Sequence, residues 1–394
     1  MNSDKIIILD GATGTMLQNM GMPKNSCTET YILNYPESIE KLQREYFLSG
    51  SDAVLAPTFG ANRPSLVGHG YRPDEVDGIC EKLAEISIEN AKKVSKETGR
   101  RLMVGGDISP TGMLLKPYGS ADPDEVLEIY KAQALTLVSS GVDFIAVETM
   151  ISAAEAVLAV RAVREASSDI PLLVTLTVNE NGRTMSGDSL AAALIILAQY
   201  GISGFGCNCS IGPDVVYSAL QPVSGIAKKL GIPLIAKPNA GLPTEDENGT
   251  HYPLTPERMA EYAEKFARIG VKYFGGCCGT TPEHIAAVSK KCLELDLSLV
   301  GIDAADCDFN PREAVANFRT YAIPDDDAEY TIVSGEDDLY DAAEEADDIL
   351  YLELGENGGD IVDAEQAYIN VPLSLKGDAK EIEKVRRRTL WKVN

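Results

Sequence analysis

Residues 274–284 read FGGCCGTTPEH, with two consecutive cysteines between glycines at the end of a short apolar run. Side chains alternate between the two faces of a strand, so Cys277 and Cys278 can share one partner only where the strand gives way to a loop. The flanking glycines permit such a loop. Pro282 and Glu283 then mark the start of a helix. The stretch therefore predicts a strand, a loop that carries two thiols, and a helix.

A metal ion is the partner that clustered thiolates favour, because zinc prefers soft sulfur ligands. A catalytic zinc site takes three protein ligands and leaves a fourth position open. Residues 206–210, GCNCS, end another apolar run and offer Cys207 or Cys209 as the third ligand. The alternatives are that these cysteines are buried as small hydrophobic residues, or that Cys277 and Cys278 form a strained vicinal disulfide.

The order of strand, loop and helix recurs over the first 290 residues. Short apolar or β-branched runs end in Gly, Asp, Glu, Thr or Cys, and stretches with helical spacing of apolar residues follow them. The expected helices are Glu75–Thr98, Asp124–Ser140, Ala153–Ala166 and Pro256–Ile269. The expected strands are Ile6–Leu9, Ala53–Ala56, Leu102–Gly105, Phe144–Val147, Leu172–Thr177, Gly204–Gly206, Leu234–Ala236 and Tyr273–Phe274.

Eight strand–helix units with nearly continuous apolar strands favour a parallel sheet that closes into an α/β (β/α)8 TIM barrel. A doubly wound open sheet is the alternative. Residues 10–15, DGATGT, lack the glycine spacing of a dinucleotide-binding fingerprint.

Polar residues follow or end most of these apolar strands. Active sites of such barrels lie at the carboxyl ends of the strands. A carboxylate that ends an apolar run is costly to bury without a partner, so a polar barrel mouth explains it best. The residues that we expect at this mouth are Asp10, Thr58, Asp107, Glu148, Cys209, Asn239, Cys277 and Cys278.

Composition narrows the class of protein. The 394 residues are 44% hydrophobic, as in an ordinary globular protein, and no apolar run approaches the length of a membrane span. Residues 1–5 lack the features of a signal peptide, so we expect a cytoplasmic protein. Eight cysteines are too few for a disulfide scaffold of this size, and the net charge of −25 argues against a nucleic-acid partner.

The last hundred residues differ from the rest. Residues 295–394 carry 25 acidic and 9 basic side chains. We therefore expect two units, a barrel over residues 1–297 and a small acidic α/β appendage over residues 298–394. In the appendage we expect helices at Gly335–Asp348 and Glu381–Lys392, strands at Ile349–Leu354 and Ala367–Val371, and a disordered acidic linker as a possibility for Pro324–Glu329.

Three thiolates around Zn²⁺ leave the centre with a formal charge of −1. Such a zinc is a weak Lewis acid for water, but it suits a substrate thiol whose pKa it lowers. The matching reaction class is S-alkylation of a thiol. A structural zinc with Cys207 as fourth ligand is the alternative. However, one residue separates Cys207 from Cys209, which is tighter than the usual ligand spacing.

The carboxylates suit an amino-acid thiol. Glu148 or Asp10 is placed to bind an ammonium group, and backbone N–H groups near Gly11 are placed to bind a carboxylate. The alternatives are that Asp10 caps the segment that follows it and that Glu148 pairs with a lysine or arginine of the barrel.

The chain resembles the homocysteine S-methyltransferases, and most closely the homocysteine-binding module of cobalamin-dependent methionine synthases. The resemblance covers roughly residues 5–290. The matching stretches are LDGATGTMLQ at 9–18, TFGA at 58–61, GGDISPTG at 105–112, ET at 148–149, GCNCSIGP at 206–213, PNAG at 238–241 and GGCCGTTPEH at 275–284.

This resemblance implies a (β/α)8 barrel that binds zinc through Cys209, Cys277 and Cys278, with Cys207 as a bystander. It also implies a zinc-bound homocysteine thiolate that takes a methyl group to give methionine, with methylcobalamin or another methylcorrinoid as donor. Asp10 and Glu148 would contact homocysteine, with Asn239 in a supporting role. The full set of substrate-binding residues that we expect is Asp10, Gly11, Thr58, Asp107, Glu148 and Asn239.

The sequence departs from the family in two places. Ala56 and Pro57 replace the Thr-Asn pair that usually precedes the Thr-Phe of the second strand. None of the three histidines lies in the Asp-x-His-x-x-Gly pattern that ligates cobalamin. We therefore expect the methyl group to come from a separate corrinoid protein or from a free donor.

Two other functions remain open from the sequence. One is a stand-alone homocysteine methyltransferase that uses S-methylmethionine or a betaine-type donor. The other is a non-catalytic regulator that binds zinc and homocysteine.

Overall fold

The structure is a computed structural model of the whole chain. It describes residues 5–116, 119–209, 212–246 and 249–312. Beyond them it describes residues 314–316, 319–322, 328, 330–333, 336–346, 349–354, 359, 362, 372–378, 380–382 and 385.

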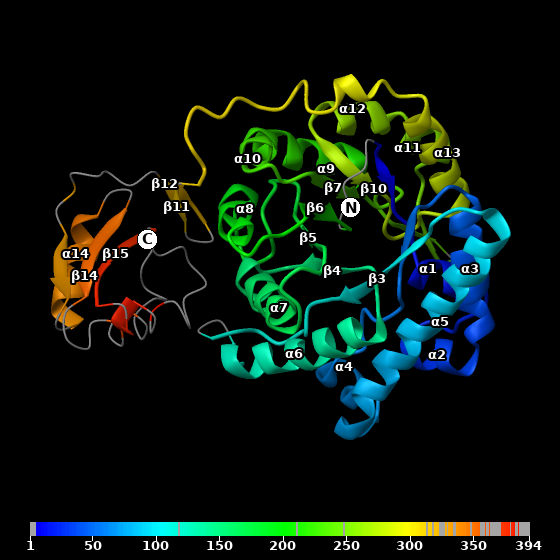
Figure 1. Cartoon of the computed structure of the whole chain (residues 1–394), viewed down its shortest axis with the longest axis horizontal. Coiled ribbons are helices and arrows are strands. Elements are labelled where there is room, and N and C mark those ends of the chain that lie inside the picture. Colours follow the sequence, from blue (N-terminus) through cyan, green and yellow to red (C-terminus); the bar gives the residue numbers. More distant parts are fainter. Residues whose placement is uncertain are drawn as a thin grey trace.

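Eight parallel strands form one sheet that curls into a barrel, with helices around it (Figure 1). The strands pair in the order β1-β10-β7-β6-β5-β4-β3-β2, so the first and last strands of the barrel are neighbours. This order confirms the expected (β/α)8 barrel and excludes the doubly wound sheet. The strands are β1 (Ile7–Ile8), β2 (Ala53–Leu55), β3 (Met103–Ile108), β4 (Phe144–Met150), β5 (Leu172–Leu176), β6 (Gly204–Asn208), β7 (Leu234–Lys237) and β10 (Val271–Phe274).

The helices follow the strands as the periodicity predicts. The expected helix at Pro256–Ile269 is divided by a turn at Glu261. Around the barrel lie α1 (Gly14–Asn19), α2 (Thr28–Asn34), α3 (Pro36–Leu48), α4 (Arg63–Gly68), η1 (Pro73–Glu75), α5 (Val76–Thr98), α6 (Pro123–Ser140), α7 (Ala153–Ala166), α8 (Leu190–Ala198), α9 (Pro213–Leu220), η2 (Gln221–Val223), α10 (Ser224–Leu230), α11 (Pro256–Ala260), α12 (Tyr262–Arg268), α13 (Pro282–Leu293) and η3 (Leu297–Leu299).

Two aspartates join β1 to β2, where the barrel closes. The Asp52 N–H donates to Ile8 O at 2.7 Å, and the Asp52 carboxylate accepts the Ile8 N–H at 3.0 Å. Asp10 Oδ2 accepts the Leu55 N–H at 2.7 Å. Carboxylates therefore take up strand N–H groups that a neighbouring carbonyl would otherwise bind.

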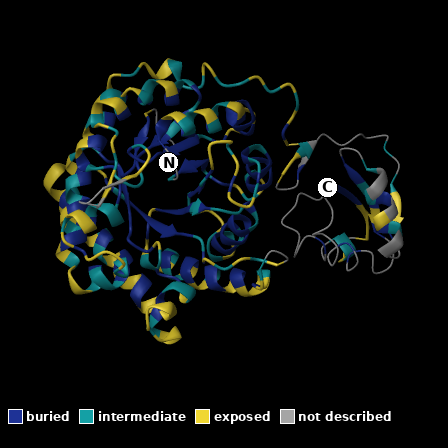
Figure 2. Cartoon of the chain, turned by 180° about the vertical axis from the view of Figure 1, so that it is seen from behind, coloured by how far each residue is buried: buried dark blue, intermediate teal, exposed yellow. Residues whose placement is uncertain are grey.

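Apolar side chains fill the barrel interior, and a second apolar cluster lies between the sheet and the helices. Figure 2 shows the strands of the barrel coloured as buried, with exposed residues on the outer helices. Phe144 lies inside the barrel at the level of Gly105, where an added Cβ would come within 2.4 Å of the Phe144 ring. The glycine therefore makes room for the aromatic ring. Above this apolar layer the inward positions become polar, and they form the site described below.

A hairpin that the sequence analysis did not predict follows β7. It consists of β8 (Thr244–Asp246) and β9 (Gly249–His251), which pair antiparallel. The hairpin ends at Tyr252, whose ring packs on Gly279 in the cysteine loop.

The C-terminal region contains a separate apolar core. Three parallel strands pair in the order β13-β14-β15, and α14 (Glu336–Glu345) lies between the first two in sequence, which confirms the expected α/β content. Ala314 and Ala316 pack instead with the barrel core, so the division at residue 297 stays a prediction. The strand expected at Ala367–Val371 and most of the helix expected at Glu381–Lys392 lie outside the described residues. The remaining strands are β11 (Val315–Ala316), β12 (Tyr321–Ala322), β13 (Thr331–Val333), β14 (Leu350–Leu354) and β15 (Leu373–Gly377).

Among the described helices, none combines the length and hydrophobicity that crossing a bilayer requires.

Candidate active site

Three cysteine sulfurs converge at the carboxyl ends of β6 and β10. The Sγ atoms of Cys209, Cys277 and Cys278 all lie within 4.8 Å of one another, and those of Cys209 and Cys278 are 3.9 Å apart. Three thiolates about 2.3 Å from a tetrahedral zinc would lie about 3.8 Å apart. The spacing and the chemistry of these sulfurs therefore fit a zinc ion.

Cys207 does not take part in this cluster. Its side chain is 1% exposed and packs in the core outside the sheet. Burial raises the pKa of the Cys207 thiol to about 12. Residues 207 and 209 would share one face on a regular strand, but β6 ends at Asn208 and Cys209 has a left-handed backbone with a φ of 60°. Cys209 therefore joins the thiol cluster while Cys207 stays in the core.

Backbone hydrogen bonds hold the cysteine loop against its neighbours. The Gly276 N–H donates to Asp10 O at 2.8 Å, and the Cys277 N–H donates to Pro238 O at 2.9 Å. A Cβ on Gly276 would lie 2.3 Å from Thr280 Oγ1, so only glycine fits there. The loop is therefore fixed to the ends of both β1 and β7.

The three thiols share hydrogen bonds. Those from Cys209 and Cys277 lower the pKa of the Cys278 thiol to about 3, and the Tyr252 hydroxyl adds a further bond to the same sulfur. The bonds that Cys277 gives to Cys209 and Cys278, together with burial, raise the pKa of the Cys277 thiol. The shared hydrogen bonds thus favour the thiolate form at Cys278 and the protonated form at Cys277.

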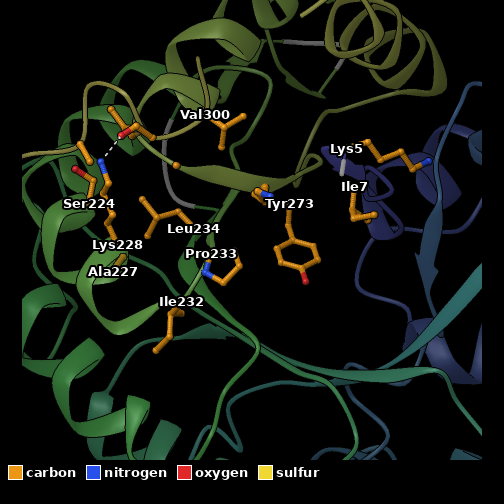
Figure 3. A pocket seen from close by; sticks show the side chains of 16 residues that line it. Lys5, Ile7, Ser224, Ala227, Lys228, Ile232, Pro233, Leu234, Tyr273 and Val300 are labelled. Atoms are coloured by element: carbon orange, nitrogen blue, oxygen red, sulfur yellow. Dashed lines mark hydrogen bonds between the residues drawn. The ribbon is translucent and has the colours of Figure 1, made fainter. Parts of the chain in front are cut away.

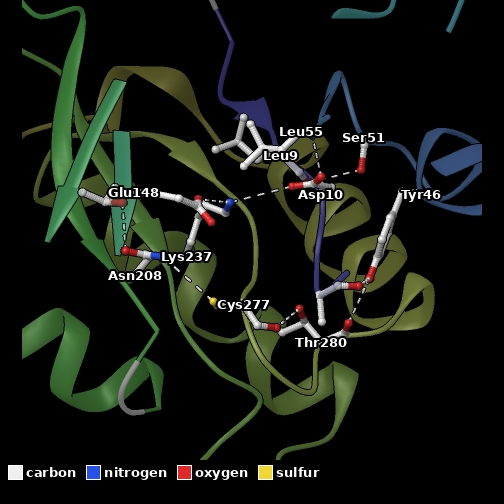
Figure 4. Close-up of polar contacts among 12 residues, drawn as sticks. Leu9, Asp10, Tyr46, Ser51, Leu55, Glu148, Asn208, Lys237, Cys277 and Thr280 are labelled. Carbon is white, nitrogen blue, oxygen red and sulfur yellow. Dashed lines mark hydrogen bonds and ion pairs between the residues drawn. The ribbon is translucent and has the colours of Figure 1, made fainter. Parts of the chain in front are cut away.

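A buried lysine lies among the carboxyl groups of the barrel interior (Figure 4). Lys237 Nζ is 2.5 Å from Glu148 Oε2 and 3.9 Å from Asp10 Oδ1. Burial alone would lower the pKa of Lys237, but attraction by Glu148 and Asp10 outweighs it and the pKa is raised. The pairing of Glu148 with a barrel lysine, which was one of the alternatives, is therefore present.

Asp10 is 3% exposed and only partly satisfied. Its Oδ2 accepts the Leu55 N–H, while Oδ1 accepts no hydrogen bond from the described part of the chain. Burial raises the pKa of Asp10 to about 6, although Lys237 opposes the shift. The carboxylate therefore joins the two closing strands and also presents an oxygen to a ligand.

Asp107 and Asn239 present two more buried oxygens. Asp107 Oδ1 and Asn239 Oδ1 have no hydrogen-bond partner within the described residues. Burial, and then repulsion from Glu148, raise the pKa of Asp107. Unpaired buried acceptors are uncommon in folded proteins, and here they fit a bound cation or donor.

Thr58 and Gly11 support the site through the backbone. Thr58 Oγ1 donates to Asp107 O and accepts the Asp107 N–H, both at 2.9 Å. A Cβ on Gly11 would lie 2.8 Å from both Thr280 Oγ1 and the Tyr46 hydroxyl, so the backbone there requires glycine. Thr58 thus fixes the backbone of Asp107 through two hydrogen bonds and leaves the Asp107 carboxyl group to face the site.

The sequence analysis missed three residues that the structure places here, namely Lys237, Asn208 and Tyr252. Lys237 ends an apolar strand as the expected carboxylates do, and that signal was sufficient to find it. Asn208 stands inside the GCNC motif, but residue type alone does not indicate which distant residues its amide contacts. Tyr252 follows the hairpin that the sequence analysis did not predict, and no pattern in the sequence indicated that it lies at the site.

A pocket also lies at the other end of the barrel (Figure 3). It has a volume of about 350 Å³, and the first residues of β1 and β7 line it together with Lys5, Lys228 and Lys272. Two of these lysines are engaged, Lys5 with Asp52 and Lys228 with Gly301 O. Its lining contains none of the clustered thiols or carboxyl groups, so this pocket is separate from the site at the carboxyl ends of the strands.

Comparisons with known proteins agree with this arrangement. Residues 7–292 match the family described as homocysteine S-methyltransferase. The chain is 33% identical over 301 residues to a protein named methionine synthase from Mycobacterium tuberculosis, and 32% identical over 298 residues to one from Mycobacterium leprae. Each alignment covers 73% of this chain and 24% of the relative, so the chain spans about a quarter of their length.

Solved structures show the same fold. The homocysteine methyltransferase MmuM from Escherichia coli in its metallated form superposes with a TM-score of 0.63 at 22% identity, over 73% of this chain and 96% of MmuM. Its oxidised form superposes with a TM-score of 0.64 at 22% identity, over 74% and 97%.

Proposed function

Because the chain belongs to the homocysteine S-methyltransferase family, we propose that it binds homocysteine at the carboxyl end of its barrel and methylates the sulfur to give methionine. One observation carries the proposal: three clustered thiols and three buried carboxyl groups converge at the same end of one barrel. The thiols suit a metal, and the carboxyl groups suit the ammonium of an amino acid.

Cys209, Cys277 and Cys278 are the proposed zinc ligands. When bound, zinc supplies positive charge that lowers the pKa of a substrate thiol and keeps its sulfur available as a nucleophile. Backbone hydrogen bonds hold the segments that carry the three sulfurs, since the N–H groups of Cys209 and Cys277 donate to Lys237 O and Pro238 O.

Asp10, Asp107 and Glu148 are the proposed partners of the substrate ammonium. Three carboxyl groups and one lysine leave the buried site short of positive charge, and an ammonium supplies it. Asn239 Oδ1 adds a neutral acceptor. We assign the substrate carboxylate to backbone N–H groups between Gly11 and Gly14, where the first N–H groups of α1 have no partner within the helix; the Ala12 N–H already donates to Thr280 O at 3.1 Å.

In the methyl transfer, the homocysteine thiol first loses its proton. A lone pair of the sulfur then forms the new bond to the methyl carbon, while the bond from that carbon to the donor breaks and the donor keeps its electron pair. The role of the protein is to hold the sulfur and the amino acid in one orientation, which converts an encounter into an intramolecular-like reaction.

We propose a methylcorrinoid on a separate protein as the donor. The mouth of the barrel carries exposed apolar side chains on the loops after β2, β3, β5 and β7, which suit a large partner. We call these four residues the apolar collar. They are Phe59 (41% exposed), Leu114 (56%), Met185 (71%) and Leu242 (55%). The acidic C-terminal unit is a further candidate contact for that partner.

The test is methionine formation by zinc-loaded protein with homocysteine and one of three donors: methylcobalamin, S-methylmethionine or betaine. Methionine formed only with methylcobalamin supports the full proposal. Methionine formed only with S-methylmethionine or betaine would support the methyltransferase activity but contradict the proposed corrinoid donor. Homocysteine binding without methionine from any donor would favour a regulator.

A further inference from the structure

Asn208 connects the two halves of the site described above. It is the last residue of β6 and is 1% exposed. Its Oδ1 accepts the Thr149 N–H at 2.9 Å and the Thr175 hydroxyl at 2.8 Å, and its Nδ2 donates to Thr149 Oγ1 at 2.7 Å. One buried amide therefore fixes the backbone and the side chain of a residue on another strand.

Thr149 needs this support because of its backbone. It has a φ of 61°, in the left-handed region that a β-branched residue rarely adopts. The pairing of β4 with β5 shifts register between Val147 and Met150, so Thr149 lies in an irregular segment of the strand. Glu148 is the residue directly before it. The hydrogen bonds from Asn208 thus help to set how the Glu148 carboxylate is presented.

The same side chain faces the thiols. Asn208 Nδ2 lies 4.0 Å from Cys277 Sγ, and the next residue in the chain is Cys209 (Figure 4). Cys209 also has a left-handed backbone, with a φ of 60°. Its N–H donates to Lys237 O at 3.1 Å, which fixes it to the strand that carries the buried lysine.

We propose that Asn208 is a positioning residue that couples the carboxylate half of the site to the thiol half. The inference rests on the proposed function, since it concerns the same metal and the same amino acid. Groups that orient metal ligands typically change metal affinity or activity by about 10–100-fold when they are lost. A side chain that only satisfied buried hydrogen bonds would affect stability without changing either subsite.

The central variant is Asn208→Asp in the full-length protein. It keeps the shape and one acceptor oxygen, but it removes the N–H donor that faces Cys277. The matched control is Asn90→Asp, because Asn90 is also buried and donates to Glu40 O from α5, away from the site. Each protein is loaded with Co²⁺, and the thiolate-to-cobalt absorption, the Co²⁺ affinity and the KM and kcat for homocysteine are measured.

We expect N208D to shift the cobalt absorption, to weaken Co²⁺ binding by about 10-fold and to raise the KM for homocysteine by about 10-fold. The N90D control should leave all three at wild-type values. A second variant, N208D combined with Thr149→Gly, should recover most of the KM, because glycine adopts the left-handed conformation without support. Its cobalt spectrum should remain shifted.

Three outcomes would overturn the proposal. The first is N208D behaving like N90D in every site measurement. The second is no recovery of KM with glycine at position 149, which would confine Asn208 to the thiols. The third applies if N208D does not fold. In that case Thr149→Val is measured instead, and an unchanged KM for homocysteine in this variant would overturn the proposal. A different result would refute the proposed function itself. This is a wild-type protein that does not bind Co²⁺, or a cobalt spectrum that does not change when homocysteine is added.

Discussion

Lys237 Nζ lies 2.5 Å from Glu148 Oε2 inside the barrel, and both side chains are less than 10% exposed. The ion pair joins β4 to β7 across the barrel interior, at the end where the thiols lie. A buried ion pair contributes little net stability as a pair, but removal of one partner leaves a buried charge uncompensated.

Lys237→Met should therefore lower the free energy of unfolding by about 3–5 kcal/mol, measured by denaturant titration at pH 7. The matched comparison is the double variant Lys237→Met with Glu148→Gln, which removes both charges. It should be more stable than the single variant. A single variant as stable as the wild type would show that the carboxyl groups do not need the lysine.

The buried carboxyl of Asp10 predicts a pH dependence of stability. Its pKa in the folded protein is about 6, above the value of 3.8 for an exposed group. The folded state therefore holds this proton more tightly than the unfolded state, and the contribution of Asp10 to stability falls as pH rises from about 4 to about 6. The shift amounts to roughly 3 kcal/mol.

Asp10→Asn should remove this dependence, because an amide does not titrate. Relative to the wild type, the variant should gain about 3 kcal/mol of unfolding free energy between pH 4 and pH 7, measured by urea titration at each pH. If the unfolding free energies of the wild type and of Asp10→Asn changed with pH in parallel, Asp10 would ionise in the folded protein as an exposed group does.

Cys278→Ala should lose zinc and keep the fold, because the thiols close only the mouth of the barrel. We expect about a 100-fold or greater loss of metal affinity, measured by chelator competition, and an almost unchanged circular dichroism spectrum. Cys207→Ala is the control and should retain the metal. Global unfolding of C278A would assign the metal a structural role.

Tyr252→Phe removes the hydroxyl that bonds to the Cys278 sulfur. Without it the thiolate keeps more of its charge, so the bound substrate thiol should lose its proton less readily. The acidic limb of the pH profile of kcat/KM should move to higher pH, with a loss of about 10-fold near neutral pH. Tyr262→Phe on α12 is the control, and an identical profile for both variants would contradict this role.

The apolar collar predicts dependence on the donor. Met185→Glu and Leu114→Glu place charge on exposed positions of the mouth. Each should lower the rate with a protein-borne methylcorrinoid by about 10-fold, since charge in an apolar contact costs free energy. The rate with free methylcobalamin should change much less. Equal effects on both donors would mean that the collar is not a docking surface.

The sequence predicted the barrel well because its signals are local. Each strand is a short apolar run, and each polar residue at the mouth follows one directly, so periodicity and chain order place both. The same order placed Cys277 and Cys278 at the mouth but left Cys207 and Cys209 both open as the third ligand, and the family resemblance favoured Cys209. These features require only that successive units close into a ring.

The contacts between distant strands were not predictable in this way. The Lys237–Glu148 pair joins residues 89 positions apart, and Asn208 reaches Thr149 across 59 positions. Left-handed backbone at Thr149 and Cys209 carries no signal in residue type, because neither is glycine. The closure of β1 onto β2 depends on aspartates whose partners become visible only in three dimensions.

The order of the strands has one more consequence. All three thiols come from the ends of β6 and β10, in the second half of the chain, whereas Asp10, Asp107 and Glu148 come from β1, β3 and β4 in the first half. A chain severed between α7 and β5 would leave the three clustered thiols on one fragment and Asp10, Asp107 and Glu148 on the other. The proposed amino-acid ligand would contact both half-barrels, so its affinity would report on their reassembly.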